Sequence, residues 1–314
     1  MAPVIPDPDR DRAQLVLVGG LVIAVGLVAL AIVLNSGIYT HNLASRADPI
    51  ASEAVGNAAV VRDSVEGLVE FAVRHHPNDA STQAANVSAG VSGVSELAAR
   101  ESARRGVLTN ATVTATSTGT TVYQTGPRDF TDGLGAADWE VASSANGVRD
   151  FQMQVQLSSL ESSSSPPADT VFNVTFEAPG DDLAVSVYED GGATSVVVEN
   201  VDTGRTFGPC VDGGSSTVID LTDATVGGEH CAALERLADL QEPFDVRYND
   251  ADEVEGSYSL VANTASVSPD LVPIGDSGPS RMDTLYAVRV EVRFQSHRVD
   301  YRTIVTAAPG EPDG

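Results

Sequence analysis

A long uninterrupted apolar segment near the N-terminus constrains this chain more than any other feature. The residues from Leu15 to Leu34 carry no charge and are mainly Leu, Val, Ile, Ala and Gly. A helix of this length is about 30 Å long, which matches the hydrocarbon core of a bilayer. The sequence therefore predicts a transmembrane helix over residues 14–38, preceded by a cytoplasmic leader of residues 1–13.

The flanks of the apolar segment favour a retained anchor over a removable signal. A secretory signal peptide has a shorter apolar core, followed by a cleavage site of small residues. Here the run ends at Asn35 and Ser36 without such a site. Arg10 and Arg12 precede the segment, and the first arginine after it is Arg46, so arginine bias places the N-terminus in the cytoplasm. The expected protein is a single-pass protein of the cell membrane, with the lipid bilayer as a partner and an extracellular C-terminal domain.

The rest of the chain is strongly acidic. The net charge is −26, and all 18 basic residues are Arg. Such a surface repels itself in dilute buffer, whereas in molar salt the Debye length is only about 3 Å and the repulsion is screened. We therefore expect a protein of an extreme halophile. Nucleic acid is excluded as a partner because phosphate contacts need clustered cations.

The residues just before the apolar segment carry a resemblance to a known family. Arg12-Ala13-Gln14-Leu15 resembles the processing site of archaeal prepilins, in which a charged and a small residue precede the cut. The resemblance implies that a prepilin peptidase cleaves between Ala13 and Gln14 and leaves the helix on the mature chain. Many pilins carry Glu at the fifth mature residue, where this chain has Val18, so docking onto other pilin-like subunits through that carboxylate stays open. The alternative is that Arg12 only sets the topology.

Roughly the first 50 residues also resemble haloarchaeal pilin-like, single-pass membrane proteins of unknown function. That resemblance includes the stretch LNSGIYTHNLASR at residues 34–46 and implies an architecture but no activity. The expected function is that of a membrane-anchored cell-surface structural or interaction protein, such as a minor pilin or a filament-associated subunit. A non-polymerising anchored ectodomain, acting as an adhesin, receptor or envelope protein, is the alternative. An exported hydrolase is a third candidate.

Residues 39–106 are predicted to form a helical stalk of two helices. Asp48 and Pro49 suit the start of a helix, although Pro49 also fits a kink in one longer helix. The first helix is expected to end at His75-His76-Pro77, and the second to run from about Ser81 to Arg105. Apolar residues recur at helical spacing in both segments: Val61, Val65, Leu68 and Ala72 in the first, and Val87, Val91, Val94 and Leu97 or Ala98 in the second.

Residues 107–308 are predicted to form a β-rich extracellular domain, followed by a tail of residues 309–314. Alternating, β-branched-rich runs separated by Gly, Pro, Asp and Ser clusters indicate strands. A short helix is expected at Glu229–Leu240 and a hairpin turn at Gln295–His297. The fold class is therefore α+β, with a mainly antiparallel, sandwich-like sheet domain. The runs that predict strands are 111–116, 151–157, 171–176, 183–188, 195–198, 286–294 and 298–305.

Two kinds of covalent modification fit a chain exposed outside the cell. Cys210 and Cys231 are expected to form a disulfide, which contributes about 3 kcal/mol by loop entropy. A metal site formed by both cysteines with His230 is the alternative. Three Asn-x-Ser/Thr sequons are candidate glycosylation sites: Asn86, Asn110 and Asn173.

Candidate catalytic residues are few, and we predict a non-enzymatic protein without a cofactor. Gly275–Pro279 (GDSGP) resembles the surroundings of the nucleophile in chymotrypsin-like serine proteases. Only 47 positions separate His230 from Ser277, which is too few for that fold, so a surface loop is expected. His75 and His76 are either metal ligands or a polar helix end. The acidic run at residues 248–255 either binds Ca²⁺ loosely through its clustered carboxylates or forms hydrated surface, and it lacks the residue order of a calcium-binding loop.

Overall fold

The computed structural model describes residues 49–164, 170–268, 271 and 278–311. The leader, the predicted processing site at Arg12, Ala13 and Gln14, and the predicted transmembrane helix lie outside the described residues, as does Ser277. The chain divides into two compact units, Met1–Asn57 and Ala58–Gly314. Within the described residues, no helix has both the length and the apolar character needed to cross a membrane.

Two helices open the described part of the chain. Helix α2 spans Pro49–His75 and helix α3 spans Ala80–Ala103. The Asp79 side chain caps α3 by accepting a hydrogen bond from the backbone N–H of Thr82 at 3.0 Å. The chain leaves α3 through Gly106, whose φ of +73° suits glycine at a helix C-terminus. The two helices predicted after residue 48 are confirmed.

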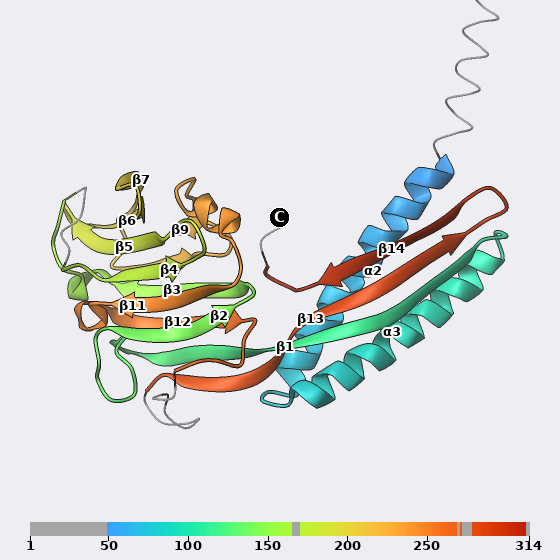
Figure 1. Cartoon of the computed structure of the whole chain (residues 1–314), viewed down its shortest axis with the longest axis horizontal. Helices are drawn as coiled ribbons and strands as arrows, with labels where there is room; N and C mark the ends of the chain where they lie inside the picture. The colour runs from blue at the N-terminus through green and yellow to red at the C-terminus, as the bar shows by residue number, and fades with distance from the viewer. Residues whose placement is uncertain (1–48, 165–169, 269–270, 272–277, 312–314) are drawn as a thin grey trace, which may run out of the picture. The chain divides into compact units, whose positions relative to one another are not determined.

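The helices pack on three long strands, β1 (Leu108–Asp129), β13 (Ser280–Gln295) and β14 (Asp300–Ala307) (Figure 1). The shared core joins valines of both helices to apolar residues of the strands. The buried members are Val65, Val69, Ala72, Val87, Val91, Ala111, Leu285, Val288, Val290, Val292 and Ala307. The helices that we expected to form a stalk therefore share one core with the strands of the β-rich region.

The buried face of α3 differs from the predicted one at its C-terminal half. Val87 and Val91 are buried as expected, but Val94 and Leu97 are 41% and 67% exposed. Ser95 and Ser102 face the strands instead. The prediction for Val94 and Leu97 is wrong because these serine hydroxyls take the buried positions, where they hydrogen-bond to β1 residues.

The first sheet has eight strands in the order β10-β9-β8-β3-β12-β1-β13-β14. Strands β1 and β13 pair over nearly the whole length of β13, from Leu108 opposite Gln295 to Tyr123 opposite Ser280. One end of β1 contributes Ala111 to the core shared with the helices. The other end contributes Val122 to a second core, which lies between this sheet and the second sheet. The remaining strands are β3 (Val148–Gln156), β8 (Ser216–Asp220), β9 (Thr225–Val226), β10 (Glu229–His230) and β12 (Glu255–Ala262).

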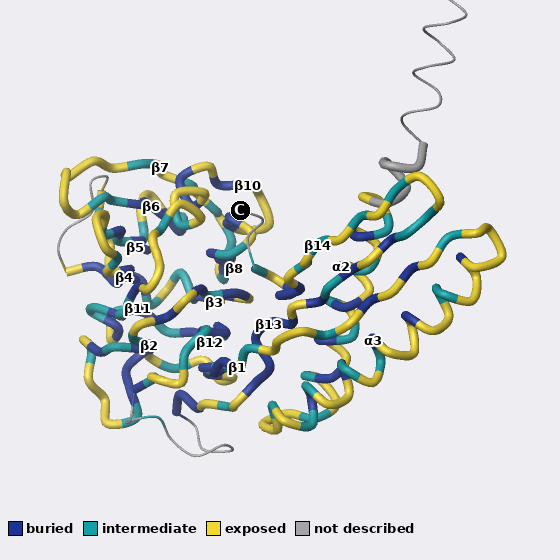
Figure 2. Tube along the Cα trace, turned by 45° about the vertical axis from the view of Figure 1, so that its right-hand side comes forward, coloured by how far each residue is buried: buried dark blue, intermediate teal, exposed yellow. Residues whose placement is uncertain are grey.

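The second sheet has six strands in the order β2-β11-β4-β5-β6-β7. The two sheets share one apolar core, and Figure 2 shows buried segments on strands of both sheets. An aromatic cluster of Phe130, Trp139, Phe172, Tyr248 and Tyr258 fills part of it. The bounds are β2 (Trp139–Ala145), β4 (Asn173–Glu177), β5 (Leu183–Asp190), β6 (Ala193–Asn200), β7 (Arg205–Asp212) and β11 (Phe244–Asn249).

All named strand pairs among the described residues are antiparallel, which confirms the mainly antiparallel, β-rich class. The hairpin predicted at Gln295–His297 is present, and Ser296 N donates to Val299 O at 2.7 Å. The helix predicted over Glu229–Leu240 is only partly correct. Its first residues pair with β9 as strand β10, and helical structure is limited to the 3₁₀ segment η2, Leu234–Asp239.

Candidate interaction site

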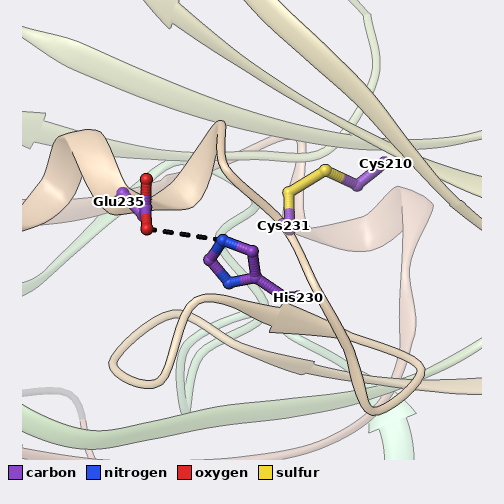
Figure 3. The surroundings of a disulfide bond; sticks show 4 residues. All are labelled: Cys210, His230, Cys231 and Glu235. Atoms are coloured by element: carbon purple, nitrogen blue, oxygen red, sulfur yellow. Dashed lines mark ion pairs between the residues drawn. A yellow bond between two sulfur atoms is a disulfide. The ribbon is translucent and has the colours of Figure 1, made fainter.

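The predicted disulfide between Cys210 and Cys231 is confirmed (Figure 3). Cys210 lies on β7, an edge strand of the second sheet, and Cys231 directly follows β10, an edge strand of the first. Their Cα atoms are 5.8 Å apart. The bond therefore links an edge of one sheet to an edge of the other. The alternative metal site with His230 is wrong, because disulfide sulfurs are not thiolates and metal binding needs thiolates.

His230 instead faces Glu235, as Figure 3 shows. Its Nε2 atom lies 3.4 Å from Glu235 Oε1, and about 60% of each side chain is exposed. An exposed pair of this kind contributes little to stability. Glu235 belongs to η2, and the first residue of η2, Leu234, donates its backbone N–H to Cys231 O at 3.0 Å.

A stack of one aromatic ring and two arginines lies beside the disulfide. The guanidinium carbon of Arg205 is 4.8 Å from the ring centroid of Phe207, and that of Arg236 is 4.9 Å from it. Such contacts are attractive cation–π interactions. Arg205 and Phe207 belong to β7, whereas Arg236 belongs to η2. The disulfide therefore holds together the two segments that form the stack.

The arginines of this stack differ from most of the others in the described residues. Neither Arg205 nor Arg236 forms an ion pair or hydrogen bond with a carboxylate in the part of the chain that the structure describes. Other arginines do pair with acids: Arg62, Arg100, Arg104, Arg149, Arg247, Arg293 and Arg302. Arg74, Arg281, Arg289 and Arg298 also lack a carboxylate partner within the described residues, so the distinguishing feature of Arg205 and Arg236 is that both stack on one aromatic ring.

A cleft of about 240 Å³ opens beside the stack. It combines an apolar floor with amide and carboxylate groups and one guanidinium. The side chain of Asn200 donates to Asp181 Oδ1 at 2.9 Å, which orients both groups at the rim. The lining residues are Pro179, Gly180, Asp181, Leu183, Asn200, Phe207, Arg236, Asp239, Leu240 and Gln241. This mixture suits an amphipathic ligand with an acidic group.

A second, larger cleft of about 460 Å³ contains Tyr286, Glu242 and Glu311. The Tyr286 hydroxyl donates to Glu311 Oε1 at 3.0 Å. Burial, followed by the charge of Glu311, raises the pKa of both Tyr286 and Glu242. The buried Arg149 side chain donates to Pro309 O at 2.7 Å in the same region. These polar contacts hold the C-terminal residues against β3 and β13, so we assign the cleft a structural role.

The three predicted glycosylation sites differ in accessibility. Asn86 is exposed on α3, and Asn110 is exposed on β1. Asn173 is half-buried on β4, and its Oδ1 atom accepts hydrogen bonds from Asn249 at 2.7 Å and Thr175 at 3.0 Å. Glycosylation at all three stays a prediction, and Asn86 and Asn110 offer the more accessible amides.

The other candidate residues take structural positions. His75 stacks on Phe71 with ring centroids 3.9 Å apart, and its Nδ1 lies 2.8 Å from Phe71 O. The backbone carbonyl of His76 accepts a hydrogen bond from Gln83. Asp250, in the acidic run, has a pKa raised by burial and by the nearby charges of Asp138 and Asp252. No group of three or more His, Cys, Asp or Glu side chains that would hold a metal occurs within the described ranges.

Sequence reasoning missed the Arg205–Phe207–Arg236 stack. Arg205 and Phe207 are two positions apart, a spacing that places side chains on the same face of a strand. That signal was present in the sequence RTFGPC, but β7 was not predicted. Arg236 had no local signal, because its position beside Phe207 depends on the fold and on the disulfide.

Residues 9–140 match DUF7261, a family of unknown function. The matched part includes the apolar segment, both helices and β1, and it ends within β2. It covers less than half of the chain, so it shows a similarity to that family rather than membership. No curated protein and no solved structure matches this chain.

Proposed function

We propose that this chain is a membrane-anchored, cell-surface structural or interaction protein of a halophilic archaeon, with a pilin-like N-terminal segment. The observation that carries the proposal is the uncharged run from Leu15 to Leu34, which is long enough to span a bilayer. The leader would be removed before Gln14 and the helix retained. The acidic, disulfide-containing domain would then lie outside the cell, where disulfides persist.

The surface of α2 supports an association with other subunits. Val60 and Phe71 are 61% and 57% exposed. They lie eleven residues apart, which is about three helical turns, so both lie on one face of α2 with the exposed Gly67 between them. Ser64 and Arg74 are exposed on the same face, so the face is mixed, and its two apolar side chains with the glycine between them offer a packing site for a neighbouring helix. This feature favours the pilin-like form of the proposal.

The family similarity supports the same proposal. The segment matching DUF7261 joins the apolar run to α2, α3 and β1. The apolar run, both helices and β1 thus fall within one matched segment, while β13, β14 and most of the sandwich lie beyond it. A common anchoring region attached to a different outer domain is expected of surface proteins that share an anchor and differ in what they bind.

A non-polymerising anchored ectodomain is the second candidate, and the cleft lined by Phe207 and Arg236 favours it. A ligand-binding cleft on the sandwich is useful to an adhesin or receptor whether or not subunits assemble. The two candidates differ in location after shearing of cells. A filament subunit separates with the sheared fraction, whereas an anchored receptor stays with the membranes.

The anchor is tested with a charge placed inside the apolar run. Val25→Asp introduces a carboxylate near the centre of the run, which costs about 3 kcal/mol in membrane insertion. Val4→Asp adds the same charge to the leader and serves as the control. The proposal predicts that the native chain and Val4→Asp stay with membranes or sheared filaments, whereas Val25→Asp loses much of that fraction. Equal membrane retention of the two variants would contradict an anchor at this position.

A further inference from the structure

We propose that the cleft beside Arg205, Phe207 and Arg236 binds an anionic sugar unit, bearing a carboxylate or a sulfate, from an acidic polysaccharide. The inference rests on the proposed surface function, which brings the cleft into contact with polysaccharides outside the cell. Arg236, which lines the cleft, and Arg205, which stacks on the same Phe207 ring, are assigned to the acidic group of the sugar. The amides and carboxylates that line the cleft are assigned to its hydroxyl groups.

The two guanidinium groups on Phe207 favour an anionic ligand on their side of the cleft, away from the carboxylates of Asp181 and Asp239 that we assign to hydroxyl groups. Both guanidinium groups lie within 4.9 Å of one ring centroid, in a chain whose net charge is −26. Within the described residues neither group pairs with a carboxylate. Two like charges at close range repel each other, and a bound anion offsets that repulsion. The anion also accepts charge-assisted hydrogen bonds from the guanidinium groups.

Arginine suits such a site at high ionic strength. The Debye length in molar salt is about 3 Å, so long-range attraction contributes little there. A guanidinium group binds carboxylate or sulfate oxygens through a planar fork of donors at contact distance. The stacking of Arg205 and Arg236 on Phe207 orients these forks before any ligand arrives. Directional contacts of this kind persist where simple charge attraction is screened.

The remaining lining favours a sugar over an acidic peptide. Asn200 and Gln241 provide amides, and Asp181 and Asp239 provide carboxylate acceptors. Sugar hydroxyl groups donate to carboxylates and exchange hydrogen bonds with amides. An acidic peptide such as polyglutamate has no hydroxyl groups to donate to Asp181 and Asp239, so it leaves these lining groups without partners. The cleft volume of about 240 Å³ also matches a small cyclic unit better than a peptide segment.

The disulfide contributes by fixing the geometry of the cleft. Phe207 is three residues before Cys210, and Arg236 is five residues after Cys231. Linking the two segments reduces the ordering that a ligand would otherwise have to impose. Reduction of the disulfide is therefore expected to weaken ligand binding even where the sandwich stays folded.

The test is calorimetric titration of the full chain in detergent at molar KCl. The probes are trigalacturonate and a sulfated galactose trisaccharide, compared with neutral galactotriose and with triglutamate. We expect at least one of the two anionic sugars to bind at least about tenfold more tightly than galactotriose and triglutamate. Whichever of the two anionic sugars binds more tightly identifies the preferred acidic group, carboxylate or sulfate. Equal binding of galactotriose, or preferential binding of triglutamate, would overturn the proposal, as would no binding of either anionic sugar.

Substitutions of arginine distinguish binding in the cleft from a general effect of surface charge. Arg236→Gln and Arg236→Lys are both expected to weaken binding about tenfold, because lysine keeps the charge but loses the planar fork. Arg298→Gln removes an exposed arginine in the turn before β14 and is expected to change binding less than twofold. If Arg298→Gln weakens binding as much as Arg236→Gln, general charge and not the cleft binds the sugar. Circular dichroism and an intact disulfide by mass confirm that each variant is folded.

This test is independent of the proposed anchoring. Sugar binding is measured in detergent and requires no membrane location. An anchored chain that binds none of the anionic sugars refutes the sugar site alone. A chain that binds them but is found in the cytoplasm refutes the surface function alone.

Discussion

The completely buried side chain of Gln83 connects α3, to which it belongs, with the turn after α2 and with β13. Its Nε2 donates to His76 O at 2.8 Å, and its Oε1 accepts from Leu285 N at 2.6 Å. We expect Gln83→Leu to lower the free energy of unfolding by about 2 kcal/mol, because both backbone groups lose their partner inside the protein. Urea titration of the full chain measures this. Gln154→Leu, at an exposed site of β3, is the control and should change stability by less than about 0.5 kcal/mol. Equal effects of the two substitutions would refute the role of Gln83.

The cap of α3 gives a prediction about pH. Hydrogen bonds from the Thr82 side chain and backbone, and then from Ser81, lower the pKa of Asp79 to about 2. The folded pKa lies below the ordinary value, so the cap stabilises α3 above about pH 4 and is lost as the pH falls through about 2.

Asp79→Asn tests this effect, since asparagine caps a helix without titrating. Helix content, followed by circular dichroism between about pH 5 and pH 1.5, should decline less at the acidic end in Asp79→Asn than in the native chain. Asp79→Ala should show a weaker helix at every pH. A native chain and an Asp79→Asn variant with the same acid transition would show that the cap does not depend on the charge.

The buried residues of α3 could be predicted from the sequence only in part. Val87 and Val91 were correctly assigned to the buried face of α3, because apolar spacing is visible locally. Ser95 was not, because its buried position depends on Asn110 and Ala111 of β1, to which its hydroxyl is hydrogen-bonded. A buried serine is stable only with such partners, and the partners are known only once the helix is placed on the strand.

At the scale of elements, the disulfide fixes β7 against the rest of the sandwich. Strand β7 has mostly exposed residues and pairs with β6 on one side, so it has little apolar burial of its own. We expect the double substitution Cys210→Ser with Cys231→Ser to lower the free energy of unfolding by about 3 kcal/mol, since the bond closes a loop of 21 positions. Urea titration measures the loss, and native-state hydrogen exchange locates it.

Exchange in β7 should rise more than exchange in the central strands β4 and β5. Val201→Ser, at an exposed apolar site of the β6–β7 turn, is the matched surface control. Uniform exchange across the second sheet after removal of the disulfide would contradict a local role.

Some strands could be predicted from the alternation of apolar residues in their sequence, and others could not. The run 183–188 predicted β5, because buried valines alternate with other residues there. Strand β11 alternates buried Phe244, Val246 and Tyr248 with half-buried residues, so its pattern was also readable, although it was not predicted. Strand β7 contains Gly208 and Pro209, which are typical of turns and are tolerated in a strand at the end of a sheet. Its pairing depends on β6 and the disulfide rather than on its own pattern.

At the scale of the whole molecule, the charge of −26 predicts a dependence on salt. Screening reduces the self-repulsion of the folded chain, which is more compact than the unfolded chain. We expect the melting temperature to rise by on the order of 10 °C between about 0.1 M and 2 M KCl. Sucrose at a matched osmolality does not screen charge and is the control. A melting temperature that is constant or falls with KCl would contradict salt adaptation.

The sequence predicted the helical and β-rich regions, but not how they are joined. Strands β1 and β13 extend from the helix-packed core into the sandwich, so the two regions share their longest strands. The length of β1 was underestimated because its middle is rich in Thr, Ser and Gly. Such residues form a stable strand here because β13 pairs with them throughout and β12 pairs on the other side from Thr120 onward.

The central claim is that the apolar segment stays on the mature chain and holds the domain at the cell surface. Intact mass measurement of the native protein, purified from separated membrane, cytoplasm and medium fractions, tests it most directly. We predict a chain that begins at Gln14, retains the segment from Leu15 to Leu34, and is found with membranes or sheared filaments. A chain found in the cytoplasm, or in the medium without its first forty residues, would contradict the account.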